Sequence, residues 1–343
     1  SFNSDKGLAY YENYKKILKW LDGDSYLPPP IEVNLDPVMG CNLNCYFCIT
    51  QNYTRDAKIK KLPFDYMQKL VYFLADWGVK GLCLSGGGEP TLHQRLPDLI
   101  HIAALEMDVA VVTNATNVIP ELLTCRWVAL SVDAASRETY ETVKGKDLFD
   151  KVCSNISNLV KQRNGSKTDL CFKFLILPEN QYEIFDACKL AKALGVQDFH
   201  ARPVDFERSD IAGARPLPLD IEAIHRQFEQ CHEIETDDFH VYTITHKFDT
   251  DFHVKCDFSS CLAASLVLPV LTDGNAYICV EHKMEEEYCL GSFDDILNWW
   301  GGDRHRQMIK DIIPQRDCSR CIYSSYHQQI EAVKTDSMCL SFP

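Results

Sequence analysis

Short apolar, β-rich runs alternate with helix-like patterns between residues 31 and 205, and this alternation constrains the fold more than any other feature. Successive strands that are separated by helices pair in parallel through helical crossovers. The runs carry apolar residues on both faces, as strands buried between two layers do. The expected strands are residues 31–35, 81–84, 109–113, 127–132, 171–177 and 199–203. We therefore predict an α/β fold built on a partial (β/α)6 barrel, similar to a TIM barrel, with parallel strands.

The alternation stops on both sides of this segment, which suggests three parts. Residues 1–30 form an N-terminal helical extension that ends in three prolines. The partial barrel takes up residues 31–215. Residues 216–343 hold a linker helix, short β-like pieces that include a hairpin, and many cysteines. We expect bound metal to support the fold of so small and cysteine-rich a tail.

Charge and cysteine content restrict the class of protein. The chain has 35 Lys and Arg against 49 Asp and Glu, a net charge of −14, which argues against a nucleic-acid partner. No apolar stretch approaches the roughly 20 residues that cross a bilayer, and the N-terminus lacks the apolar core of a signal peptide. We therefore expect a cytoplasmic protein without membrane contact. Disulfides are uncommon in that compartment, so the 16 cysteines first suggest metal or catalytic sites.

Three cysteines, Cys41, Cys45 and Cys48, follow the first expected strand with C-x3-C-x2-C spacing. Thiolates on one loop can converge on one metal centre, and this set leaves one coordination position without a cysteine. Structural zinc sites close all four positions, whereas reactive sites keep one open. The loop also lies where α/β barrels carry their catalytic loops. On spacing alone, a zinc knuckle remains the alternative.

A second group of cysteines lies in the tail. Cys261 and Cys279 flank an expected β-hairpin with Gly274 at its turn, and Cys318 and Cys321 form a C-x2-C knuckle. A hairpin and a knuckle can bring four thiolates around an iron–sulfur cluster or a zinc ion. Most other cysteines are expected to be small buried hydrophobes.

Taken in order, these motifs resemble those of the radical SAM superfamily. Three cysteines with this spacing hold that family's [4Fe-4S] cluster, and S-adenosylmethionine (SAM) chelates the fourth iron. Residues 85–90, SGGGEP, resemble the family's GGE motif, and residues 113–115, TNA, resemble its TNG motif with alanine in place of glycine. The tail resembles the shortened SPASM domain called twitch, in which four cysteines hold an auxiliary [4Fe-4S] cluster.

The resemblance implies roles for individual residues. Cys41, Cys45 and Cys48 would hold the first cluster, and Cys261, Cys279, Cys318 and Cys321 the auxiliary one. Glu89 carries a carboxylate that could pair with the ammonium of SAM. The residues expected at the SAM site or the adjoining pocket are Phe47, Gly87, Gly88, Glu89, Asn114, Ser131, Asp133, Lys173, Asn180 and Arg202. The candidates for a hydrogen donor to a substrate radical are Cys231, Cys256, Cys289 and Cys339, for each of which simple burial is the alternative.

The implied activity is reductive cleavage of SAM to a 5′-deoxyadenosyl radical, with an electron donor such as flavodoxin or ferredoxin. The expected substrate is a small polar molecule of sugar, aminocyclitol or nucleoside type, which is oxidised or epimerised. A maturase of a ribosomally made peptide and a non-enzymatic metal-binding protein are the alternatives. A related family that acts on GTP is set aside because residues 335–343 lack its Gly- and Arg-rich C-terminus.

Overall fold

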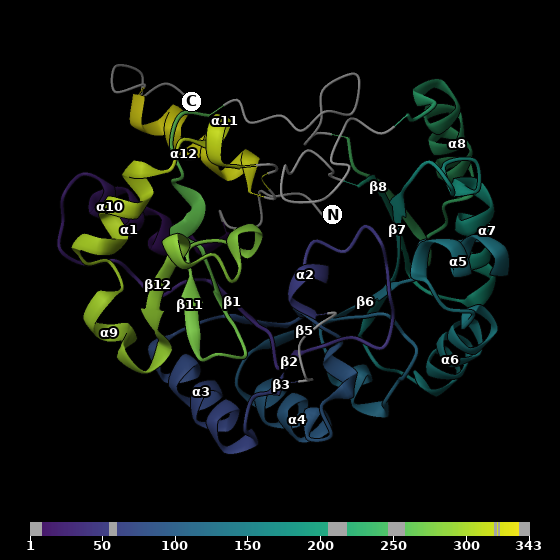
Figure 1. Ribbon diagram of the computed structural model, residues 1–343, viewed down its shortest axis with the longest axis horizontal. Coiled ribbons are helices and arrows are strands. Elements are labelled where there is room, and N and C mark those ends of the chain that lie inside the picture. Colours follow the sequence, from purple (N-terminus) through teal and green to yellow (C-terminus); the bar gives the residue numbers. More distant parts are fainter. Residues whose placement is uncertain are drawn as a thin grey trace.

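The computed structural model describes residues 9–54, 60–204, 218–245, 258–318, 321 and 323–335. Its centre is one curved ten-stranded sheet in the order β12-β11-β10-β1-β4-β5-β6-β7-β8-β9, with helices along its outer side (Figure 1). The six expected barrel strands are present and neighbouring ones pair in parallel. They are β1 (Glu32–Leu35), β4 (Gly81–Leu84), β5 (Asp108–Thr113), β6 (Trp127–Ser131), β7 (Asp169–Ile176) and β8 (Asp198–Pro203). The predicted α/β fold with parallel strands is therefore confirmed.

The C-terminal part of the chain extends this sheet at both edges. β9 (His240–Thr243) pairs in parallel with β8, and β10 (Val267–Val270) pairs in parallel with β1. Gly274, at φ +79°, turns β10 back into the antiparallel strands β11 (Asn275–Tyr277) and β12 (Cys289–Ser292). The expected hairpin is thus part of the main sheet, which continues across the domain boundary predicted near residue 215.

Helices connect the parallel strands along the outside of the sheet. Three of these helices end at a glycine in the left-handed region, where a side chain would be strained: Gly78 after α3, Gly145 after α5 and Gly195 after α7. The helices of this layer are α3 (Phe64–Trp77), α4 (Leu96–Glu106), α5 (Arg137–Lys144), α6 (Phe149–Gln162), α7 (Ile184–Leu194) and α8 (Ile221–Glu233).

Shorter elements complete the described part of the chain, and no helix within it is long and apolar enough to cross a membrane. Strands β2 (Val38–Met39) and β3 (Lys60–Lys61) form a separate antiparallel pair. The remaining α-helices are α1 (Tyr11–Leu21), α2 (Gln51–Thr54), α9 (Ile296–Trp299), α10 (Asp303–Asp311), α11 (Pro314–Asp317) and α12 (Ser324–Thr335). Single 3-10 turns are η2 (Pro90–Leu92), η3 (Pro120–Thr124), η4 (Ala263–Ser265), η5 (Val280–His282), η6 (Glu286–Tyr288) and η7 (Phe293–Asp295).

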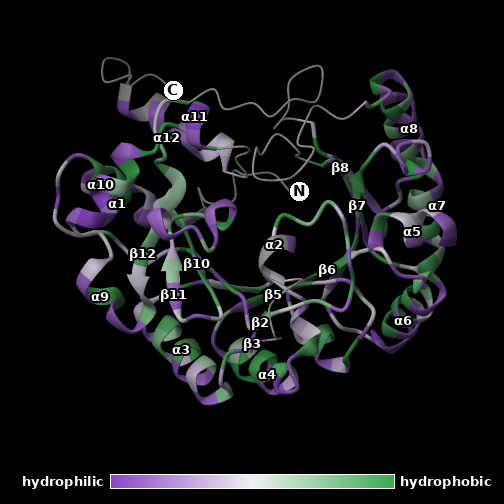
Figure 2. Ribbon diagram, viewed as in Figure 1, coloured by the Kyte–Doolittle hydropathy of each residue, from purple (hydrophilic) through white to green (hydrophobic). Residues whose placement is uncertain are grey.

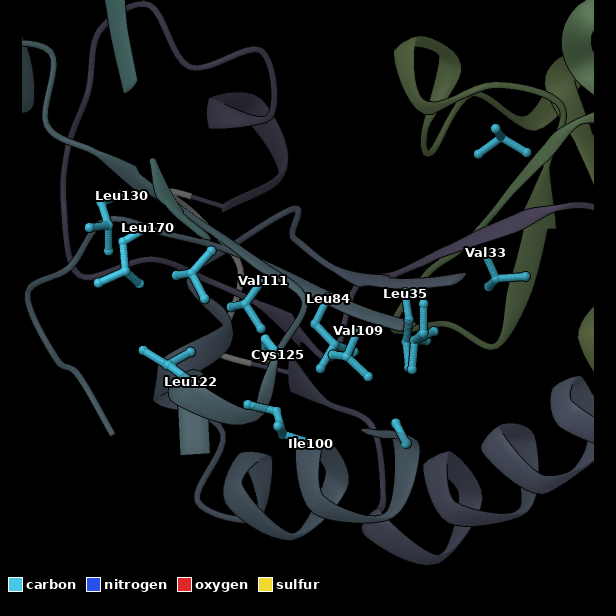
Figure 3. Close-up of a cluster of buried hydrophobic side chains, with 14 of the residues drawn as sticks. Val33, Leu35, Leu84, Ile100, Val109, Val111, Leu122, Cys125, Leu130 and Leu170 are labelled. Carbon is cyan, nitrogen blue, oxygen red and sulfur yellow. The ribbon is translucent and has the colours of Figure 1, made fainter. Parts of the chain in front are cut away.

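Side chains of each strand alternate between the helical layer and the inside of the barrel. This alternation follows from the two-residue period of a strand. The outward set is apolar and packs against the helices; Figure 3 labels Val33, Leu35, Leu84, Val109, Val111, Leu130 and Leu170 of this set. Figure 2 shows the result, mostly apolar strands inside a layer of helices with mixed hydropathy. The inward set is the one that lines the functional site.

The C-terminal helices pack against α1 through an aromatic cluster. His305 of α10 is fully buried between Trp20 and Trp300, with ring centroids 5.4 and 4.8 Å away. Its Nδ1 accepts a hydrogen bond of 3.1 Å from the backbone N–H of Gly301. Burial, with a smaller contribution from Arg306, lowers the pKa of His305 to about 3. The imidazole is therefore neutral in the folded protein at neutral pH.

This pKa predicts acid sensitivity. Between pH 6.5 and about 3 the unfolded chain binds a proton at His305 that the folded chain does not, so stability falls as the pH falls. The slope is at most about 1.4 kcal/mol of unfolding free energy per pH unit. Urea unfolding at pH 7, 6 and 5 should give a shallower slope for His305→Phe than for the unchanged protein, whereas the exposed control His101→Gln should keep the original slope. Equal slopes for all three would contradict a neutral buried His305.

Candidate functional site

The cysteine loop begins just beyond strand β2, near the C-terminal ends of the barrel strands. Cys41 Sγ accepts a hydrogen bond from the N–H of Leu43 at 3.4 Å, and Cys48 Sγ lies 3.2 Å from Thr50 Oγ1. Burial raises the pKa of Cys45 to about 11, opposed by Lys144 and reinforced by the other two thiols. Burial is also the main cause of the raised pKa of Cys41, to which Cys48 contributes. The three sulfurs are thus close enough to influence one another's charge.

The chemistry of this cysteine set fits an iron–sulfur cluster. Within the described ranges no three His, Cys, Asp or Glu side chains form a compact single-ion site. A [4Fe-4S] cluster binds each thiolate at a different iron, so its ligands lie further apart than those of one ion. Metal binding would also deprotonate thiols whose pKa burial raises. The three thiols and their loop therefore suit an iron–sulfur cluster with one open iron.

The glycine loop, residues 85–88, lies directly against the cysteine loop. A side chain on Gly88 would place its Cβ 2.0 Å from the carbonyl oxygen of Gly40, and Glu89 donates its N–H to that oxygen at 2.9 Å. A Cβ on Gly86 would lie 2.3 Å from the Gly88 oxygen. Gly87 has more room, since the nearest atom to its added Cβ is Asp36 Oδ2 at 3.5 Å. Glycine is therefore required at positions 86 and 88, because any side chain there would collide with the backbone.

Glu89 holds the glycine loop to the end of β5. Its Oε1 accepts hydrogen bonds from the N–H and hydroxyl of Thr91 at 3.0 and 2.7 Å and from the hydroxyl of Thr113 at 2.7 Å. Its Oε2 accepts the N–H of Asn114 at 2.8 Å. Burial raises the pKa of Glu89 and these bonds oppose the rise. The carboxylate is mainly a brace between two loops, and a contact with SAM stays a prediction.

Asn114 links the third motif to the cysteines. Its Nδ2 donates to Asn42 Oδ1 at 2.8 Å and lies 3.7 Å from Cys41 Sγ. Ala115 follows in the left-handed region, at φ 58°. Glycine adopts that conformation without strain, which gives a physical reason for glycine at the third position of the TNG motif. Alanine is accommodated here at some cost in strain.

Asp133 and Asn180 brace the opposite side of the site. Asp133 Oδ1 accepts the N–H of Leu175 at 2.7 Å, and its Oδ2 forms a buried ion pair with Lys144. Asn180 is fully buried; its Nδ2 donates to the carbonyl oxygens of Asp133 and Leu175 at 2.8 Å, and its Oδ1 accepts from Leu177 at 2.7 Å. The Asn180 side chain therefore binds the main chain of these loops in the structure, and its place at the pocket stays a prediction.

Two further predicted residues lie at the edge of the site. Phe47 is buried against Val143, Leu177 and Val204, and Lys144 Nζ lies 5.3 Å from its ring centroid. Ser131, partly buried at the end of β6, pairs in register with Lys173 of β7. Their contacts with SAM remain predictions.

A cavity of about 420 Å³ opens inside the barrel next to these loops. Lys173 of β7 and Arg202 of β8, both predicted as pocket residues, line it. His200 of β8 also lines it and pairs with Lys173 in the strand register. Burial lowers the pKa of Lys173, and the charge of Arg202 lowers it further. Glu32 and Glu281 line the cavity as well. The complete lining is Glu32, Asn34, Ile49, Thr50, Cys83, Ser85, Gly86, Val112, Trp127, Lys173, His200, Arg202, Ile244, Val280, Glu281, Lys283 and Tyr323.

The alternation of strand side chains explains which residues the sequence analysis missed. The side chains of Glu32 and Asn34 on β1 and of Cys83 on β4 point to the inside of the barrel. Those of Lys173 and Arg202 do the same. The alternation of side chains along β1 could therefore have predicted that Glu32 faces the cavity. Cys83 was expected to be core packing, since an isolated cysteine in an apolar run resembles any other small buried residue.

The four cysteines predicted to hold the auxiliary cluster line one enclosed apolar pocket. Cys261, Cys279, Cys318 and Cys321 meet there, although up to 60 positions separate them in the sequence. Burial raises the pKa of Cys261 well above its usual value, and the other three thiols add to the rise. His282 also lines the pocket, with its Nε2 3.9 Å from Cys318 Sγ. The arrangement suits a four-thiolate metal centre.

The hydrogen-donor candidates do not reach the barrel cavity where the structure describes them. Cys231 is fully buried between α8 and α7, where its Sγ lies 3.8 Å from the Ile184 carbonyl oxygen. Cys289 starts β12, and neither it nor Cys231 lines the barrel cavity. Their role as hydrogen donors stays a prediction. Cys256 and Cys339 lie outside the described residues.

Comparison with known proteins identifies the domain. The model of the radical SAM superfamily matches residues 35–191. These residues form a radical SAM domain. That superfamily uses a [4Fe-4S] cluster and S-adenosylmethionine, the two cofactors expected from the sequence. An auxiliary cluster is a separate matter, since the matched segment ends before the four cysteines of the tail.

Two curated relatives each match less than half of the chain. A probable GTP 3′,8-cyclase of Saccharolobus islandicus (strain M.14.25 / Kamchatka #1) is 26% identical over 167 residues, which is 47% of this chain and 52% of the relative. The GTP 3′,8-cyclase of Chlorobaculum tepidum is 29% identical over 140 residues, 37% of this chain and 40% of the relative. The chain therefore spans about half the length of the curated relatives it matches.

Solved radical SAM structures share the fold over most of the chain. SuiB of Streptococcus suis bound to S-adenosylmethionine superposes with a TM-score of 0.67 at 16% identity, over 90% of this chain and 74% of that one. The structure of anSMEcpe with bound AdoMet has a TM-score of 0.59 at 16% identity, over 88% and 95%. At such identity the likeness concerns the fold alone.

The glycine contacts predict a contrast between neighbours. Gly88→Ala forces a Cβ into the Gly40 backbone and should lower the free energy of unfolding by about 1–3 kcal/mol, the usual cost of overpacking. The Cβ added by Gly87→Ala would make only an ordinary van der Waals contact. This variant should therefore lose less than about 1 kcal/mol of unfolding free energy. Urea unfolding of both variants measures the difference. Equal losses of stability would show that the close approach of the two loops is not needed.

Proposed function

We propose that this protein is a radical SAM enzyme that acts on a small polar substrate held in the barrel cavity. The observation that supports this most directly is the meeting of two loops at the cavity. Ile49 and Thr50, directly after Cys48, line it together with Ser85 and Gly86 of the glycine loop. A cofactor held by the cysteine and glycine loops would face a substrate in the same space. Oxidation and epimerisation are the proposed outcomes.

Cys41, Cys45 and Cys48 would hold the first cluster, and the glycine loop would hold SAM beside it. When bound, these cofactors supply a radical that takes a hydrogen atom from an unactivated C–H bond. The chain orients what they act on and keeps water away. Asn114 fixes the cysteine loop through Asn42, and Glu89 fixes the glycine loop, so both rest on the strand ends.

The cavity lining suggests the substrate's polarity. Lys173 and Arg202 together offer positive charge on one wall, which suits a carboxylate or phosphate group. On β1, Glu32 accepts a hydrogen bond from Asn34 Nδ2 at 2.7 Å, and burial raises its pKa. A carboxyl group so held can bind a hydroxyl or an amine. An anionic sugar or a nucleotide meets both requirements.

We also propose an auxiliary [4Fe-4S] cluster at the four cysteines of the tail. The shared pocket of Cys261, Cys279, Cys318 and Cys321 supports it, and so does its closeness to the cavity, since Glu281 and Tyr323 line both. A tetrahedral zinc site is the alternative for the same four thiolates. A low-potential carrier such as flavodoxin or ferredoxin would supply electrons, and the proposed compartment is the cytoplasm.

Two other substrate classes follow from the relatives. GTP is the substrate named for the curated relatives, and an anionic nucleotide suits the basic wall of Lys173 and Arg202. A peptide is suggested by SuiB, whose structure is known with the precursor peptide SuiA. The mixed charges that line the barrel cavity favour the small polar molecule over the peptide. Nucleotides and peptides are therefore both included in the substrate test below.

Iron content separates the two proposed clusters. Anaerobic reconstitution should give about eight irons per chain. Cys279→Ala/Cys318→Ala and Cys41→Ala/Cys45→Ala/Cys48→Ala should each retain about four. Cys153→Ser, which alters a cysteine of α6 outside both sites, should retain about eight. Iron and zinc are measured together, because about four irons and one zinc in the unchanged protein would contradict the auxiliary cluster.

The basic wall predicts a substrate preference. In a screen of sugar phosphates, nucleotides, amino acids and short peptides, substrate-dependent consumption of SAM should favour anionic small molecules. Lys173→Met should lower kcat/KM for such a substrate by about 10- to 100-fold, the loss of one charge-assisted contact, while substrate-free SAM cleavage stays close to that of the unchanged protein. A preference for neutral molecules, or no effect of Lys173→Met, would contradict this assignment.

A further inference from the structure

A buried ion pair joins two segments that lie far apart in the sequence. Lys283 Nζ lies 2.8 and 2.9 Å from the two carboxylate oxygens of Asp36, across 247 positions of sequence. Asp36 is 1% exposed and Lys283 8%. Buried charges are costly unless each is paired, so either residue alone would be poorly tolerated at this place. The sequence gives no hint of the pair, and neither residue belongs to the motifs discussed above.

The same carboxylate orients the glycine loop. Asp36 Oδ2 accepts the N–H of Gly87 at 2.7 Å. The carbonyl oxygen of Gly87 in turn accepts from Thr50 Oγ1 at 2.9 Å. Both backbone groups of Gly87 are thus fixed by the chain, and Asp36 controls one of them. If Asp36 moved, the peptide plane of Gly87 would lose its orientation.

Lys283 belongs to the segment that shapes the four-cysteine pocket. It follows η5, which starts directly after Cys279, and the N–H of Glu281 donates to Cys279 Sγ at 3.5 Å. His282, the residue before Lys283, lies beside Cys318 Sγ. The position of the Lys283 backbone therefore depends on how Cys279 and Cys318 are held. A continuous series of contacts runs from that pocket through Lys283 and Asp36 to Gly87.

We propose that Lys283 is a positioning residue that couples the four-cysteine site to SAM binding at the glycine loop. With the cysteines gathered, Lys283 pairs with the Asp36 carboxylate and holds it against the Gly87 N–H. When Lys283 is lost, Asp36 remains a buried charge without its cation. The carboxylate then no longer has the partner that fixes its position, and its hydrogen bond with the Gly87 N–H weakens. The inference rests on the proposed function, since it takes the glycine loop as the SAM site.

Coupling of this kind is measured by a thermodynamic cycle on SAM affinity. The dissociation constant of SAM is determined by anaerobic equilibrium dialysis on reconstituted protein without reductant, so that no turnover is involved. The four proteins are the unchanged chain, Lys283→Met, Cys279→Ser/Cys318→Ser, and the combination of all three changes. We expect Lys283→Met and the cysteine pair each to weaken SAM binding about tenfold. The combined variant should be no weaker than Lys283→Met alone.

Two further variants separate positioning from general damage. Asp36→Asn/Lys283→Met removes both buried charges but keeps an amide oxygen for the Gly87 N–H, so it should bind SAM within about threefold of the unchanged protein. Lys334→Met removes a lysine from a more exposed pair with Asp22 and should leave the affinity unchanged. Urea unfolding is recorded for every variant. If Lys283 had a purely structural role, its loss would lower the free energy of unfolding, and Asp36→Asn/Lys283→Met would not restore SAM binding.

The outcomes distinguish this inference from the proposed function. Failure of the unchanged protein to bind SAM would overturn both. SAM binding that Lys283→Met leaves intact, or losses that multiply in the combined variant, would overturn the coupling alone. Failure of the Asp36→Asn/Lys283→Met rescue would overturn the positioning role as well, because the amide would then hold Gly87 without restoring the site.

Discussion

The parallel pairing of neighbouring strands, from β1 through β4, β5 and β6 to β7, is the constraint on which the site depends. Parallel strands carry their C-terminal ends to one edge, so the loops that follow them meet there whatever their distance in sequence. The cysteine loop, the glycine loop and the Asn114 turn come together for this reason. Their contact is close: Gly88 and Gly40 touch backbone to backbone, and Glu89 joins two loops with four hydrogen bonds.

Two buried ion pairs also hold the loops of the site in place. Asp133 with Lys144 braces the loop after β6, and Asp36 with Lys283 braces the glycine loop against the C-terminal segment. Such pairs add little net stability compared with apolar packing, but they fix geometry, since breaking one leaves an uncompensated charge. Both pairs lie next to backbone groups of the site, Leu175 in one case and Gly87 in the other. The two ion pairs therefore fix the orientation of these backbone groups, which a non-directional apolar contact would not do.

Much of the fold and of the metal sites could be predicted from the sequence. The strand pattern gave the barrel, and the spacing of Cys318 and Cys321 with the hairpin indicated a four-thiolate pocket that the structure brings together. Lys173 and Arg202 stood out as charges in apolar strands. The sequence could not show that β9 and β10 join the barrel sheet, because pairing over such distances has no local signal. Asp36–Lys283 was missed for the same reason. The hydrogen bonds of Asn180 to the main chain were not foreseen either, because a polar residue after a strand can face the backbone as well as a ligand.

The central claim is that Cys41, Cys45 and Cys48 hold a cluster that cleaves SAM. It is tested most directly by incubating the anaerobically reconstituted protein with SAM and dithionite and quantifying 5′-deoxyadenosine and methionine by mass spectrometry. The account predicts that both products form in equal amounts, and that Cys45→Ala forms neither while Cys279→Ala/Cys318→Ala still forms both. Absence of 5′-deoxyadenosine from the iron-loaded, reduced protein, or equal formation by Cys45→Ala, would contradict it.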